Sequence, residues 1–242
     1  MRTVVLSTPR AVARTVADFL TRAIRTTPDL VLGLPAGGTP VPVYRALVDR
    51  YRAREIDFDR VATFNLDEFC GLSSDDPRTY RAFMHRYLFD HVNIRADRRH
   101  LLQGDARSWR AEVAQFEARL AELGGLDLAI VGIGSNGHIA FNEPGPELIA
   151  RTHRVKLTDA TRRANAETFG NRWRSVPTHG LTMGMGTIAS ARGVVLIATG
   201  AHKAAIVRRA LTGPVTPHVP ASLLQLHPNL VIALDRAAAA RL

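Results

Sequence analysis

The sequence predicts an α/β fold: a doubly wound, mostly parallel, Rossmann-like sheet with helices on both faces. Several short segments are apolar throughout instead of alternating with polar residues, which is typical of strands buried on both faces of a parallel sheet. Segments with apolar residues at helical spacing separate them, as the crossovers of a parallel sheet require. The chain has 242 residues, 46% of them hydrophobic, so we expect a single α/β domain spanning residues 1–242.

Strands and helices alternate from the beginning of the chain. The β-branched run Thr3–Leu6 predicts a strand, and apolar residues at helical spacing predict a helix over Pro9–Ile24. After the apolar segment Asp29–Leu34, Thr39 and Pro40 are predicted to open a helix as its N-cap and first residue. The other elements predicted in this half are a strand at Arg60–Phe64 and helices at Pro77–His91 and Ser108–Leu123.

The second half of the chain continues the alternation. The wholly apolar segments Leu126–Ile133 and Gly193–Ala198 predict two buried strands. We found no internal repeat and no linker, which supports one domain. The remaining predicted elements are strands at Arg154–Leu157 and Asn229–Leu234 and helices at Asp159–Phe169 and Ala201–Leu211.

The net charge of +10 raises the question of a nucleic-acid partner. The basic residues are 30 Arg and 2 Lys, spread over the whole chain, and aromatic residues are only 6%, without a basic run interleaved with aromatics. A positive field suits an anionic small molecule equally well. No apolar run approaches the roughly 20 residues of a membrane span. We therefore expect no nucleic acid and no membrane as partner, while a homo-oligomer stays possible.

Cysteine usage and the N-terminal residues predict a cytoplasmic protein. The only cysteine, Cys70, leaves no partner for an internal disulfide, as is usual in a reducing compartment. The first residues lack the apolar stretch and the small-residue cleavage site of a secretory signal, so we expect none.

Four polar or glycine-rich turns each follow a predicted strand. In an open parallel sheet, ligands bind beyond the carboxyl ends of the strands. We therefore expect these turns to converge on one edge of the sheet and to form the functional site. They are Leu34–Pro40, Asn65–Phe69, Gly134–Gly145 and Thr199–Lys203.

Two of these turns have features of an anion site. Gly37, Gly38 and Thr39 lie between a strand and a helix start, where backbone N–H groups can approach an anion closely. The segment is neither a Walker motif nor GxGxxG, and a tight turn capped by Thr39 is an equal alternative. Lys203 would supply a compact point charge in an arginine-rich chain, and the alternative is a solvated surface lysine.

The other two turns carry acid–base groups. Asp67 can act as a base toward a carbon acid, with a turn-capping aspartate as the alternative. Tyr80 could line the same pocket or belong to the core. His138, with Asn136 and Glu143 beside it, can be held in one tautomer and move protons near neutral pH. Because His138 and Glu143 are only two candidate ligands, we expect no metal.

Six segments carry a resemblance to a known family, in order from about Val31 to Asn229. They are LGLPAGGTP, FNLDEFCGL, TYRAFMHRYLF, GIGSNGHIAFNEPG, LTMGMGTI and LLQLHPN. Together they resemble the glucosamine-6-phosphate deaminase family. The related 6-phosphogluconolactonases share the fold but lack the Asn-Glu-Pro after the histidine. The resemblance implies a fold of the sugar-phosphate isomerase type and conversion of glucosamine 6-phosphate and water to fructose 6-phosphate and ammonia, without a cofactor, in amino-sugar catabolism.

The resemblance also implies a role for each candidate residue. Asp67 matches the base that takes the proton from C2 and hands it to C1 through an enediol. His138 matches the group that moves protons during ring opening, and Glu143 and Asn136 match its supporting partners. Some family members have Asp where this chain has Asn136, which brings no charge. The residues that match the substrate- and phosphate-binding positions are Gly37, Gly38, Thr39, Lys203 and Tyr80.

The chain departs from the family pattern at Glu167, where the family has a phosphate-binding arginine, and a carboxylate there would repel a phosphate. The arginines that could replace it are Arg162, Arg163, Arg172 and Arg174. This departure keeps two alternatives open: an isomerase or lactonase acting on another sugar phosphate, and a non-catalytic sugar-phosphate sensor.

A second departure concerns regulation. The segment after Glu143, with His153 and Val155, lacks the basic residues that allosterically activated members use. We therefore expect no activation by N-acetylglucosamine 6-phosphate.

Overall fold

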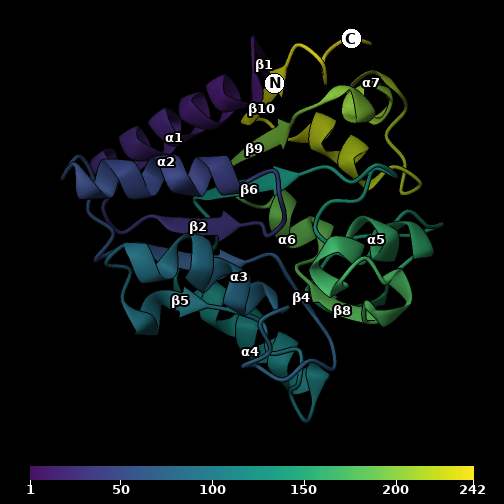
Figure 1. The fold of residues 1–242 in the computed structure, drawn as a ribbon, viewed down its shortest axis with the longest axis horizontal. Helices are drawn as coiled ribbons and strands as arrows, with labels where there is room; N and C mark the ends of the chain where they lie inside the picture. The colour runs from purple at the N-terminus through teal and green to yellow at the C-terminus, as the bar shows by residue number, and fades with distance from the viewer.

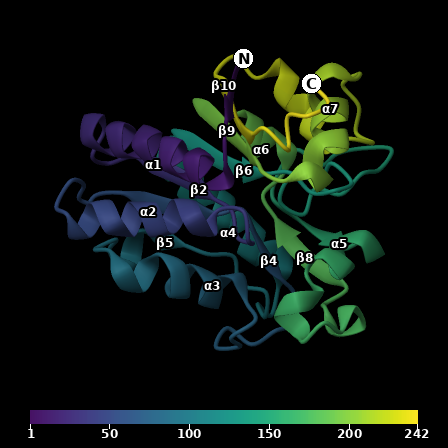
Figure 2. The ribbon, with the colours of Figure 1, turned by 45° about the horizontal axis from the view of Figure 1, so that its top comes forward.

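A parallel sheet of seven strands forms the centre of the molecule (Figures 1 and 2), in a computed structural model that describes residues 1–242. All neighbouring strands are parallel, so the predicted doubly wound α/β fold is confirmed. The order across the sheet is β1 (Arg2–Leu6), β10 (Leu230–Asp235), β9 (Gly193–Ala198), β6 (Leu128–Gly132), β2 (Val31–Leu34), β3 (Ala62–Asn65) and β5 (Arg99–His100). After β2 the chain adds β3 and then β5 on one side of the sheet, and after β6 it adds β9 and then β10 on the other side. The point where the strand order reverses therefore lies between β2 and β6.

Helices cover both faces of this sheet. One face is covered by α1 (Pro9–Thr26), α2 (Val41–Arg52) and α3 (Tyr80–Tyr87), and the other by α4 (Trp109–Glu122), α6 (Met185–Ala189) and α7 (Ala204–Thr212). Alternate strand residues supply the two cores: Leu32 and Leu34 face α1 and α2, while Val31 faces α4 and its neighbours. None of the helices is long and apolar enough to cross a membrane.

A second, smaller sheet adjoins the first and consists of β4 (Asp67–Phe69), β8 (His179–Thr182) and β7 (His153–Lys156), all antiparallel. The helix α5 (Asp159–Ala164) follows β7. The chain passes from β3 directly into β4, with Leu66 as the only residue between the two sheets. The segment Asn65–Phe69, expected to be a turn, is therefore the junction of two strands.

Three predicted helix limits are wrong. The helix predicted at Pro77–His91 begins only at Tyr80, after the N-cap Thr79, and ends at Tyr87. The one predicted at Asp159–Phe169 ends at Ala164, and a short 3-10 turn follows it. The one predicted at Ala201–Leu211 begins with a 3-10 turn before α7. In the turns that follow the first two helices, Phe89 and Phe169 are buried in apolar cores and continue the apolar spacing, whereas the turn before α7 buries no residue.

The predicted N-cap of α2 is also wrong. The helix begins at Val41, Pro40 occupies the N-cap position, and no side chain caps the first turn. Thr39 is one residue too early to act as the cap. In the first turn, Val41 and Val43 donate their N–H groups to the Gly38 and Pro40 carbonyls. The backbone donors left for a ligand are therefore those of Gly37, Gly38 and Thr39, ahead of the helix.

Candidate active site

The four predicted turns converge on one cavity of about 200 Å³ at the carboxyl ends of the central strands. It lies at the reversal point between β2 and β6, where ligands bind in folds of this kind. The expected convergence is therefore confirmed. The residues that line the cavity include Gly37, Gly38, Thr39, Asp67, Tyr80, Gly134, His138, Asn165 and Lys203.

One wall of the cavity is built for an anion. Gly37 has φ 104°, a conformation that favours glycine and turns its backbone into the site ahead of α2. Lys203 also lines the cavity, and its Nζ donates a hydrogen bond to the Ile133 carbonyl at 2.8 Å. Burial lowers the pKa of the Lys203 ammonium. It is the only lysine or arginine that lines the cavity.

Asp67 stands at the junction of the two sheets and lines the cavity, with 7% of its surface exposed. Burial, and then the neighbouring charge of Glu68, raises the pKa of Asp67 well above its usual value. A carboxylate with a raised pKa is a stronger base when ionised, which suits proton transfer.

Glu68 points away from the cavity and holds α3 in place. Its carboxylate accepts the backbone N–H groups of Phe69, Tyr80 and Arg81 at 2.7, 3.0 and 2.9 Å. Burial raises the pKa of Glu68 to about 7, although these donors lower it. No sequence pattern signals this contact, because it joins residues 12 and 13 positions apart through tertiary packing.

Tyr80 combines the two roles considered for it. Its ring stacks on Phe141 with centroids 5.7 Å apart and belongs to a small aromatic core with Phe69. Its hydroxyl donates to Asn165 Oδ1 at 3.0 Å, which ties α3 to the segment after α5. Tyr80 therefore lines the cavity and also closes one side of it.

The imidazole of His138 packs closely against Gly134, where a Cβ atom would be 2.3–2.4 Å from the ring. Asn136 Oδ1 accepts the backbone N–H of His138 at 3.2 Å, and Asn136 Nδ2 donates to Glu143 Oε2 at 3.0 Å. The structure thus brings the three predicted acid–base residues together. Burial lowers the pKa of His138 to about 4, against the opposing effect of Glu143, so the imidazole is neutral at neutral pH.

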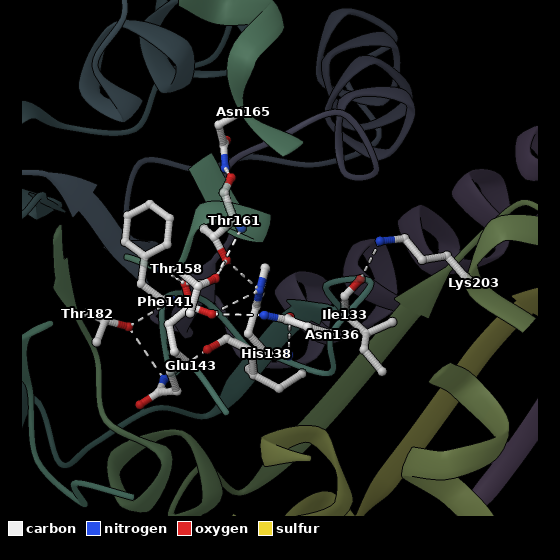
Figure 3. A network of polar contacts seen from close by, with 12 residues as sticks. Ile133, Asn136, His138, Phe141, Glu143, Thr158, Thr161, Asn165, Thr182 and Lys203 are labelled. Carbon is white, nitrogen blue, oxygen red and sulfur yellow. Dashed lines mark hydrogen bonds and ion pairs between the residues drawn. The ribbon is translucent and has the colours of Figure 1, made fainter. Parts of the chain in front are cut away.

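Two threonines complete this group, and sequence analysis did not find them. Thr158, the N-cap of α5, donates its backbone N–H to Glu143 Oε1 at 3.0 Å, and its hydroxyl lies 3.2 Å from the same oxygen. The Thr161 hydroxyl lies 3.2 Å from His138 Nδ1 (Figure 3). The capping position of Thr158 is readable from the sequence, but its contact with Glu143 depends on the fold.

The arginines considered as replacements at the phosphate do not line the cavity. Arg162 donates to the carbonyls of Val176 and Arg174, and its guanidinium lies over Trp173. Arg163 also packs on the Trp173 ring. Glu167 is exposed and likewise does not line the cavity, so its charge is screened from the site.

The structure contains no cluster of three or more His, Cys, Asp or Glu side chains that could hold a metal ion. A buried carboxylate, a neutral imidazole with a carboxylate partner and a lysine beside a glycine turn instead define an acid–base site for an anionic small molecule on an α/β fold. The chain belongs to the family of glucosamine-6-phosphate isomerases and 6-phosphogluconolactonases, whose family model matches residues 7–232.

Several relatives are similar over nearly the whole chain. Glucosamine-6-phosphate deaminase of Rhodopirellula baltica is 47% identical over 227 residues, which cover 94% of this chain and 90% of the relative. Glucosamine-6-phosphate deaminase 2 of Bacillus subtilis is 44% identical over 227 residues, covering 93% and 91%. The solved structure of a monomeric glucosamine-6-phosphate deaminase superposes with a TM-score of 0.96 at 39% identity, over 100% of both chains.

A more distant structure shares the fold. The 6-phosphogluconolactonase of Trypanosoma brucei superposes with a TM-score of 0.77 over 100% of this chain and 98% of that chain, at 20% identity. At this identity the likeness concerns the fold alone.

Proposed function

We propose that this protein converts glucosamine 6-phosphate and water to fructose 6-phosphate and ammonia. The observation that carries the proposal is the convergence of Asp67, His138 and Lys203 on one cavity. Relatives named as deaminases at 39–47% identity support it. Residues 1–242 would act as one catalytic domain in the cytoplasm.

The phosphate binds at the anion wall in this proposal. Backbone N–H groups of Gly37, Gly38 and Thr39 approach it, and Lys203 supplies the charge. Since Glu167 is exposed and no arginine lines the cavity, the phosphate is held by one side-chain cation and by backbone donors.

Ring opening is the first chemical step. The closed pyranose hides the carbonyl, so a proton must leave the C1 hydroxyl and another must reach the ring oxygen. His138 is neutral and therefore able to accept the first proton and return it to the ring oxygen. Glu143 and Asn136 hold the loop that carries His138 in position.

Proton transfer between carbons follows. Asp67 removes the proton from C2 and gives it to C1, through an enediol-type intermediate that carries the amino group. The product is an imine at C2, to which water adds before ammonia leaves. One carboxylate serves both transfers because C1 and C2 are adjacent, and Tyr80 forms the wall beside it.

The two alternatives have less support. The lactonases are similar only in fold, at 20% identity. A sugar-phosphate sensor has no need of a buried base or of a supported imidazole, both of which are present.

Simultaneous assay of ammonia and fructose 6-phosphate after addition of glucosamine 6-phosphate tests the proposal. We expect the two products in equal amounts. No ammonia at high enzyme concentration would refute the proposal and direct the search to other sugar phosphates.

A further inference from the structure

We propose that Thr161 and Thr158 form a hydroxyl relay that connects His138 to Glu143 and fixes the imidazole in one tautomer. The relay deepens the proposed function, because it rests on His138 as the proton-moving group. Thr161 and Thr158 are positioning residues in this scheme and need not touch the substrate.

The imidazole of His138 and the carboxylate of Glu143 are too far apart for a direct hydrogen bond to fix the tautomer. His138 Nδ1 and Glu143 Oε2 are 3.8 Å apart, beyond hydrogen-bond distance. A path through the threonines has shorter steps. Thr161 Oγ1 is 3.2 Å from His138 Nδ1, Thr158 Oγ1 is 3.3 Å from Thr161 Oγ1, and Thr158 Oγ1 is 3.2 Å from Glu143 Oε1 (Figure 3).

The surrounding donors set the direction of this path. Glu143 receives N–H groups from Asn136 and from the Thr158 backbone, so both of its oxygens act as acceptors. The Thr158 hydroxyl has one proton and two acceptors within reach, Glu143 Oε1 at 3.2 Å and Thr161 Oγ1 at 3.3 Å. In the proposed relay it donates to Glu143, because a carboxylate is the stronger acceptor. Its oxygen accepts the backbone N–H of Thr161 at 3.2 Å and can also accept the Thr161 hydroxyl.

The last step follows from this direction. With its own proton given to Thr158, the Thr161 oxygen is left as an acceptor for His138, so the imidazole carries its proton on Nδ1. The other ring nitrogen, Nε2, is then unprotonated and ready to accept a proton from the substrate. The relay thus selects the tautomer that ring opening requires.

Burial of two members of the relay favours a path through protein groups, while Thr158 is half-buried. Thr161 is 1% exposed, and the Glu143 side chain is 7% exposed. Buried polar groups without water must find partners in the protein. The position of α5 is secured independently, because Asn165 Nδ2 donates to the Thr161 carbonyl at 2.9 Å and Tyr80 donates to Asn165.

Thr161→Val tests the relay, because valine keeps the shape of threonine and removes the hydroxyl. We expect kcat to fall about 10- to 100-fold, as for the loss of one buried hydrogen bond, with KM changed less than about threefold. Thr161→Ser keeps the hydroxyl and should retain most of the activity. Thr21→Val is a matched control, since Thr21 is a buried threonine on α1 whose hydroxyl has no partner.

Nitrogen-15 NMR of the His138 ring is the second readout and does not depend on turnover. His138→Gln assigns the signal. We expect the Nδ1–H tautomer in the wild-type protein and a mixture in Thr161→Val. If the valine variant does not fold, Thr161→Ala removes the same hydroxyl without added volume.

Two results would overturn the relay: an unchanged tautomer and kcat in Thr161→Val, or equal losses in the valine and serine variants. If the wild-type protein releases no ammonia but its His138 tautomer still differs from that of Thr161→Val, the relay is retained and the proposed function is refuted.

Discussion

The close contact between Gly134 and His138 gives the sharpest prediction. In a Gly134→Ala variant the new Cβ would lie 2.3 Å from Cε1 and 2.4 Å from both ring nitrogens of His138. Carbon atoms in contact are normally about 3.5 Å apart, so the imidazole must move by about 1 Å. The backbone of Gly134 has little freedom to move instead, because its N–H donates to the His138 carbonyl at 2.9 Å.

A displacement of this size should disturb catalysis more than binding. Misplacing a reacting group by about 1 Å can reduce the rate 100-fold, and the 3.2 Å contact with Thr161 would be lost as well. We expect kcat for ammonia release to fall about 100-fold, with KM changed far less. Steady-state kinetics on glucosamine 6-phosphate measure both.

Gly145→Ala is the matched control in the same loop. Its Cβ would meet only the Glu147 carbonyl, at 3.7 Å, an ordinary contact, so kcat should stay within about twofold of wild type. Full activity of Gly134→Ala, with the fold intact, would show that His138 does not need its position and would refute the reasoning.

Three further predictions concern the base and regulation. Asp67→Asn should bind substrate nearly as well as wild type but lose about 10²–10⁴ in kcat, measured by kinetics and by direct binding; unchanged kcat would remove Asp67 as the base. The ionised form of Asp67 is the active one and its pKa is raised, so kcat/KM should fall as the pH drops through that pKa. Glu68→Gln removes the neighbouring charge and should move this acid limb to lower pH; a pH–rate profile that does not move would contradict this. Rates with and without N-acetylglucosamine 6-phosphate should be equal, and a clear increase would disprove the expected lack of activation.

The sequence was sufficient to predict six of the seven strands of the main sheet and the segments that form the site, whereas the two-residue edge strand β5 (Arg99–His100) was missed. Strands such as Leu128–Gly132 are buried on both faces, and their composition shows it directly. The turns that carry Gly37, Asp67 and His138 follow those strands, and parallel strands bring their ends to one edge.

The second sheet was predicted only in part, since the strand expected at Arg154–Leu157 is present as β7 (His153–Lys156) but its other two strands were not expected. Its strand Asp67–Phe69 has three residues, too few for any periodicity, and forms only because it pairs with His179–Thr182. The contact of Thr161 with His138 spans 23 residues and depends on how α5 packs. The positions of the arginines near Glu167 could not be predicted either, since their packing on Trp173 depends on the tertiary structure.

The single residue between the two sheets determines where the base lies relative to the glycine turn. The glycine turn after β2 belongs to the large sheet, whereas Asp67 is the first residue of the small one, with Leu66 between them. Deleting Leu66 would draw Asp67 back by about 3.3 Å and turn its side chain to the opposite face, because side chains alternate along a strand. In the proposed binding mode, the junction therefore fixes where the base stands relative to the phosphate, and a change in its length would place Asp67 away from the second carbon.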